Sequence, residues 1–61
     1  MILENTVITD EESNTQTYIY LNNKGQFGAV LKDLDAGEVV GITYYDTIEK
    51  ALSKRDTIVS K

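Results

Sequence analysis

The side chains that could carry chemistry in this chain are carboxylates, lysines and tyrosines, because the sequence contains no His and no Cys. A catalytic site would therefore have to rest on paired acids, a lysine or a tyrosine. The acids gather in two polar segments, residues 10–12 and 33–38, that are typical of turns. In a turn, nearby water makes the pKa of a carboxyl hard to shift. We therefore expect a protein that is not an enzyme.

One acidic segment invites comparison with a calcium-binding loop. Asp33, Asp35 and Glu38 flank Gly37, but an EF-hand requires Gly at position 6 and Glu at position 12. Here the glycine comes fifth, and we interpret the segment as a hairpin turn with solvated acids. The four glycines are also spaced for hairpins rather than for a phosphate-binding loop. We expect neither a metal nor a cofactor.

Length and composition favour one small folded domain that spans residues 1–61. Hydrophobic residues make up 41% of the chain and charged residues 26%, which is a globular balance. A chain this short buries only about 60% of the surface that its unfolded form exposes. Because neither a disulfide nor a thiolate metal site is available, very good packing or a partner subunit must compensate. We expect a homo-oligomer, most simply a dimer.

The charge balance bears on partners and location. Ten Asp and Glu against six Lys and Arg give a net charge of -4, which disfavours nucleic acid and suits a basic partner. No apolar run approaches the roughly 20 residues of a membrane span, so no membrane contact is expected. The first residues lack the basic and apolar segments of a signal peptide, and we expect a cytoplasmic protein.

Alternation of apolar and polar residues predicts strands at residues 2–9, 15–21, 26–33 and 38–45. The segments Asn22-Asn23-Lys24-Gly25 and Asp35-Ala36-Gly37 predict tight turns. A helical spacing then follows, with Asp46 as the expected N-cap and Glu49 completing a capping box. Whether residues 56–61 continue the helix or form a strand is open; we favour the helix. The expected fold is α+β, an antiparallel β-meander of three to four strands with one C-terminal helix packed on one face.

The helix stripe of Ile48, Ala51, Leu52 and Arg55 must be buried on that sheet. The alternation predicts that the helix covers Ile19, Leu21, Phe27, Ala29, Leu31, Val40, Ile42 and Tyr44. The opposite side is then unusually apolar and aromatic, which marks a contact surface. The predicted interaction face consists of Tyr18, Tyr20, Val30, Lys32, Val39, Thr43 and Tyr45. An equal alternative is that the N-terminal strand or a second copy of the chain covers this face for stability alone.

A family resemblance runs from residue 18 to residue 58. In residues 25–33, Phe27 and Ala29 precede an Asp-containing turn, and in residues 41–52, Tyr45-Asp46-Thr47 leads to Ala51 in a helix. This pattern resembles the plant AP2/ERF DNA-binding domains and the N-terminal arm-binding domains of tyrosine recombinases from mobile elements. The resemblance implies a three-stranded sheet with a helix, and a sheet face that enters the major groove. At the corresponding positions of this chain, only Lys32 is basic.

Three functions remain open at this point. The first is a small interaction module that self-associates through the predicted interaction face, similar to phage or mobile-element accessory proteins that bind a host protein. The second is nucleic-acid binding, with tyrosines stacking on bases and Lys32 touching phosphate. The third is an acidic mimic of nucleic acid that depends on Asp33, Asp35 and Glu38.

Overall fold

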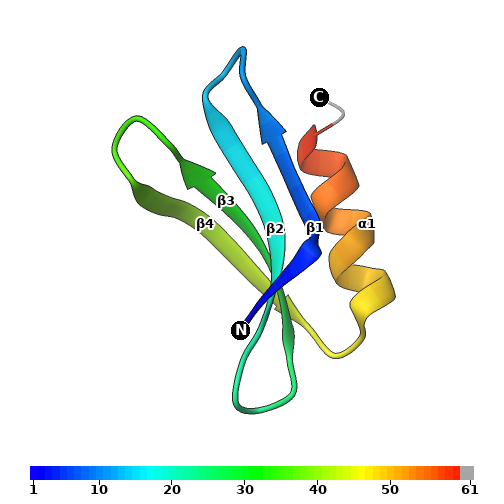
Figure 1. Cartoon of the computed structure of the whole chain (residues 1–61). Coiled ribbons are helices and arrows are strands. Elements are labelled where there is room, and N and C mark those ends of the chain that lie inside the picture. The colour runs from blue at the N-terminus through cyan, green and yellow to red at the C-terminus, as the bar shows by residue number, and fades with distance from the viewer. Residues whose placement is uncertain (60–61) are drawn as a thin grey trace.

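Four strands and one helix make up the chain, which a computed structural model describes over residues 1–59. The elements are β1 (Ile2–Asp10), β2 (Thr15–Leu21), β3 (Phe27–Asp33), β4 (Glu38–Tyr45) and α1 (Ile48–Val59). The strands form one antiparallel sheet in the order β1-β2-β3-β4, and α1 packs against β2, β3 and β4 (Figure 1). The predicted α+β meander is confirmed with all four strands, and the helix continues to Val59. The prediction for residues 60 and 61 lies outside the described residues.

The turns on either side of β3 form where the sequence places them. Gly25 and Gly37 have φ angles of 77° and 68°, in the left-handed region that glycine tolerates best. The Oδ1 atom of Asn22 accepts hydrogen bonds from the backbone nitrogens of Lys24 and Gln26, both at 2.9 Å. These local interactions explain why the hairpin between β2 and β3 is short.

Strand β1 is interrupted in its middle. Leu3 pairs with Ile19 and Ile8 pairs with Thr17, so five residues of β1 advance against two of β2. The hydroxyl of Thr6 fills the gap by accepting the Ile19 amide at 2.9 Å and donating to the Leu3 carbonyl at 2.5 Å. The Thr6 side chain thus gives these two backbone groups the hydrogen-bond partners that the interrupted strand pairing does not provide.

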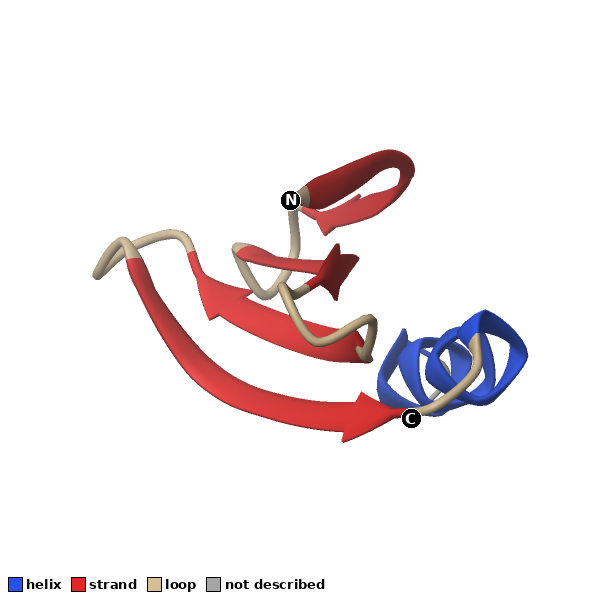
Figure 2. Cartoon of the chain, turned by 90° about the horizontal axis from the view of Figure 1, so that it is seen from below, coloured by secondary structure: helices blue, strands red, loops and turns tan. Residues whose placement is uncertain are grey.

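The core is small and lies between α1 and the sheet. Ile19, Ala29 and Ala51 are buried together, and the half-buried side chains packed on them are Leu3, Phe27, Tyr45 and Leu52. Ala51 and Ala29 are small, which lets the helix lie close to the strands. Figure 2 shows α1 beside one end of β4, while the other end of β4 extends away from the helix.

The start of α1 differs from its prediction. Thr47, not Asp46, is the N-cap: its Oγ1 accepts the Lys50 amide at 3.3 Å. Asp46 lies one residue further out and instead accepts a hydrogen bond from the Lys50 ammonium at 3.1 Å. This interaction lowers the pKa of the Asp46 carboxyl below its usual 3.8, through the hydrogen bond first and the charge of Lys50 second. Both Asp46 and Thr47 have side chains that can cap a helix, and α1 begins directly after the second of them, Thr47.

Candidate interaction surface

The predicted interaction face depends on the phase of β4, and a bulge changes that phase. Lys32 pairs with Val39, but the next residue of β3, Leu31, pairs with Gly41, so Val40 is an extra residue. Because strand side chains alternate, one inserted residue moves every later side chain to the other face. The faces predicted for residues 41–45 are therefore wrong, while Val39 lies on its predicted face.

The bulge divides the predicted interaction face between the two sides of the sheet. We call the side away from α1 the open face. Thr43 pairs with Ala29 and Tyr45 pairs with Phe27, so both lie on the helix side, where Tyr45 packs on the core. Ile42 and Tyr44 take their places. The open face consists of Gln16, Tyr18, Tyr20, Gly28, Val30, Lys32, Val39, Ile42 and Tyr44.

Burial separates the open face into a packed centre and an exposed margin. Tyr18 is 7% exposed and Val30 is 2% exposed, and Tyr20 and Lys32 are half-buried. Two of the predicted contact residues are thus covered already and contribute to stability. The exposed margin consists of Val39 at 52%, Ile42 at 42% and Tyr44 at 42% exposure. Together with the bulge residue Val40, which is 59% exposed, these residues form what we call the β4 patch.

Gly28 on β3 leaves the space that two side chains of the β4 patch, Ile42 and Tyr44, occupy. A Cβ atom on Gly28 would lie 2.9 Å from Cε1 of Tyr44 and 3.0 Å from Cδ1 of Ile42. Such distances are shorter than normal packing allows, so only glycine lets both side chains lie across β3. Sequence reasoning missed Ile42 and Tyr44. The available signal was Gly41, because a glycine inside a strand often marks a bulge.

The β4 patch belongs to an edge strand. β4 has only β3 as a neighbour, so one side of its backbone is unpaired. Edge strands are usually protected by lysine, proline, irregular geometry or a covering element. The other edge, β1, has the interruption at Thr6 and an exposed Glu4. From Val39 to Tyr45, β4 carries no charge and no proline; its protection is the bulge, together with α1 beside one of its ends.

The charged groups do not equip the open face for phosphate. Lys32 is its only basic residue, and it is half-buried. On α1, Lys50 pairs with Asp46, and Arg55 donates to the Thr6 carbonyl and to Asp56. These cations belong to the helix side of the sheet, where Lys50 and Lys54 lie near Tyr45, and not to the open face.

Two acids of the turn before β4, Asp33 and Asp35, make hydrogen bonds within that turn and to the turn between β1 and β2. Asp33 accepts the amide of Asp35 at 3.0 Å, and Asp35 accepts a hydrogen bond from the Asn14 side chain. Within residues 1–59, no group of three or more acids is placed to hold a metal ion. No helix in that part of the chain has the length and apolar character needed to cross a membrane.

Comparison with known proteins adds no relative to this description. No protein-family model matches the chain, and no curated protein or solved structure matches it either. Any proposal about function therefore starts from the geometry of the chain itself.

Proposed function

We propose that this chain is a non-enzymatic interaction module that forms a homodimer through the β4 edge, with the β4 patch in the contact. The observation that carries this proposal is an edge strand whose large apolar side chains are 42–59% exposed. An unpaired, uncharged edge offers backbone hydrogen bonds to an incoming strand, and its side chains add apolar contact.

A second copy of the chain can pair with this edge because two β4 strands can lie side by side without bringing like charges together between Val39 and Tyr45. In an antiparallel pair related by a two-fold axis, each β4 opposes the other β4. No residue between Val39 and Tyr45 is charged, so the pairing brings no like charges together there. Ile42 and Tyr44 of the two copies then lie near one another on the open face. Such aromatic and β-branched pairs stabilise adjacent strands.

The size of the chain supports the same assembly. Only five hydrophobic residues in the described part are buried: Tyr18, Ile19, Ala29, Val30 and Ala51. A standard interface takes about 800 Å² from each partner, about a fifth of the 4154 Å² accessible surface of the chain. Dimerisation at β4 would therefore add substantially to a small core.

Sedimentation equilibrium at micromolar concentration tests the proposal. We expect a species with twice the 6.8 kDa mass of the chain. Ile42→Lys places a charge in the contact and should shift the protein to monomer. Ser53→Lys adds the same charge at an exposed position of α1 and should remain dimeric. A monomeric wild-type chain, or equal dimerisation of both variants, contradicts the proposal.

The dimer is proposed to act by binding another protein, as phage and mobile-element accessory proteins of similar size and charge do. The net charge of -4 favours a basic partner. Nucleic-acid binding by the open face has less support, because Lys32 is its only basic residue. Binding of mixed DNA or RNA that weakens steeply with added salt would favour that alternative instead.

A further inference from the structure

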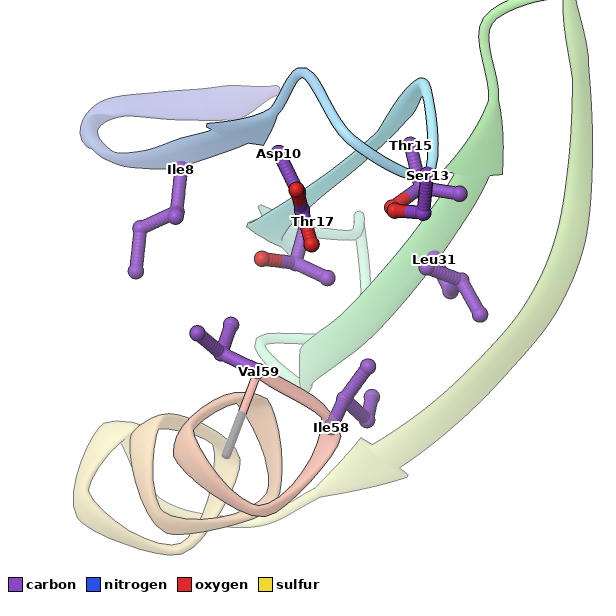
Figure 3. Close-up of a pocket in the computed structure, with 8 residues that line it drawn as sticks. All are labelled: Ile8, Asp10, Ser13, Thr15, Thr17, Leu31, Ile58 and Val59. Atoms are coloured by element: carbon purple, nitrogen blue, oxygen red, sulfur yellow. The ribbon is translucent and has the colours of Figure 1, made fainter. Parts of the chain in front are cut away.

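A cavity of about 230 Å³ lies between the C-terminal end of α1 and the β1–β2 hairpin. It is separate from the proposed dimer contact, because none of its lining residues belongs to β4. Figure 3 shows side chains from the sheet on one side and from α1 on the other. The lining residues are Ile8, Asp10, Ser13, Thr15, Thr17, Leu31, Ile58 and Val59.

Strand register explains why polar groups gather on the sheet side of this cavity. Ile8 pairs with Thr17 and Asp10 pairs with Thr15, so these four side chains share the face that α1 covers. Neighbouring pairs on one face lie within reach of the same small ligand. The carboxylate and the threonine hydroxyls therefore converge, and Ile8 adds an apolar wall beside them.

The floor of the cavity contains a polar atom without a partner. Thr17 is 4% exposed, and its Oγ1 atom has no hydrogen-bond partner within residues 1–59. Buried hydroxyls are nearly always hydrogen-bonded, so an unpartnered one at a cavity indicates a missing ligand or water. Figure 3 shows Thr17 and Asp10 projecting from the sheet toward the side where Ile58 and Val59 lie.

The rim of the cavity carries the carboxylate of Asp10, and local hydrogen bonds fix the positions of its side chains. Asp10 is exposed, and its Oδ1 atom accepts the backbone amide of Glu12 at 3.0 Å. The hydroxyls of Ser13 and Thr15 bond to each other at 2.7 Å. The rim therefore presents oxygen acceptors, and no lysine or arginine of residues 1–59 lines the cavity.

From these features we propose that the cavity binds a primary alkylammonium group, supplied by a lysine side chain of a basic partner protein. An ammonium group donates hydrogen bonds and accepts none, which matches the Asp10 carboxylate and the Thr17 hydroxyl. The aliphatic stem of lysine packs on Ile8, Leu31 and Ile58. An anion is disfavoured by Asp10, and a wholly apolar ligand would leave Thr17 without a partner. The net charge of -4 attracts a basic protein to this site.

Amide chemical shifts followed during titration with a short capped lysine peptide test the site. We expect saturable shifts at Thr17, Leu31 and Ile58. The matched norleucine peptide keeps the stem without the charge, and it should bind at least about tenfold more weakly because it lacks the charge-assisted hydrogen bonds.

Two variants with the same change in charge locate the interaction. Asp10→Asn keeps an oxygen that can accept the Glu12 amide, so the turn is preserved, but lysine-peptide affinity should fall at least about tenfold. Glu12→Gln removes a neighbouring acid that does not line the cavity and should leave affinity nearly unchanged. The amide spectrum of each free variant shows whether it is folded.

Three results would overturn the proposal. The first is an absence of shifts at the cavity, as expected if only water occupies it. The second is equal binding of the lysine and norleucine peptides. The third is a response to n-butylammonium without a response to the peptide, which assigns the cavity to a free amine.

Discussion

The guanidinium group of Arg55 in α1 donates from Nη1 to the carbonyl oxygen of Thr6 in β1, at 2.8 Å and across 49 positions of sequence. The hydroxyl of Thr6 in turn accepts the Ile19 amide of β2 at 2.9 Å. A continuous set of hydrogen bonds therefore connects the helix, the interrupted strand and its neighbour. The Arg55 side chain is only 17% exposed, so water competes little for this contact.

Replacement of Arg55 by Met should lower the free energy of unfolding by about 1.5 kcal/mol, because a charge-assisted hydrogen bond to a part-buried carbonyl is lost. Met keeps most of the apolar stem. Lys54→Met, at an exposed neighbouring position, should change stability far less. Urea denaturation of the two variants measures the difference, and equal effects would show that the Arg55 contact contributes little.

Replacement by Val should change the free energy of unfolding in opposite directions at the two buried threonines. Thr6 and Thr17 are 6% and 4% exposed, but Thr6 makes two hydrogen bonds and the Thr17 hydroxyl makes none within residues 1–59. Thr6→Val leaves the Ile19 amide unpaired and should cost about 1–3 kcal/mol. Thr17→Val removes an unpartnered buried hydroxyl and should stabilise the free protein by about 1 kcal/mol. Thermal denaturation without ligand measures both changes, and a loss of stability in Thr17→Val would contradict the assignment.

The core between α1 and the sheet predicts a further contrast. Leu52 packs on Ile19, Ala29 and Ala51, and its truncation to Ala should cost about 2–3 kcal/mol. Lys50→Ala removes only an exposed ion pair with Asp46, which water and salt screen, so it should cost far less. Chemical denaturation should therefore separate the two variants clearly. Equal losses would mean that α1 is not held by its apolar stripe.

The Asp46–Lys50 pair predicts a pH dependence of known sign. The pKa of Asp46 is lowered in the folded state by Lys50, so the folded protein favours the carboxylate. The stabilisation is present above the usual pKa of 3.8 and is lost as the pH falls through the lower, folded value. In Lys50→Ala, the pKa of Asp46 should return toward 3.8, whereas Lys54→Ala should leave it low. Carboxyl carbon shifts during an NMR titration give both values, and an unchanged pKa in Lys50→Ala would contradict this cause.

The sequence pattern was sufficient for the antiparallel meander and the helix, because period-two and helical spacings are local, but it left three or four strands open. It placed Tyr18, Tyr20, Val30, Lys32 and Val39 on one face, as the register does. It did not predict the extra residue at Val40, because a bulge depends on how two strands pair. Every face assignment after that point was therefore reversed, including those of Thr43 and Tyr45.

The correct N-cap of α1 and the cavity were also not predicted, because both depend on spatial arrangement. Asp46 and Thr47 both have side chains that cap helices, and only the backbone path decides between them. The cavity beside Asp10 and Thr17 combines residues of β1, the first turn, β2, β3 and α1. No local pattern marks such a site, because its members are brought together by strand register and by the position of the helix.

Amide hydrogen exchange of β4 at low and high protein concentration tests the β4 contact most directly. We predict that exchange of the unpaired β4 amides slows as concentration rises, because a second copy covers them, while exposed amides of β1, such as that of Glu4, exchange at an unchanged rate. Exchange of the β4 amides that is fast and equal at both concentrations would contradict the proposed dimer.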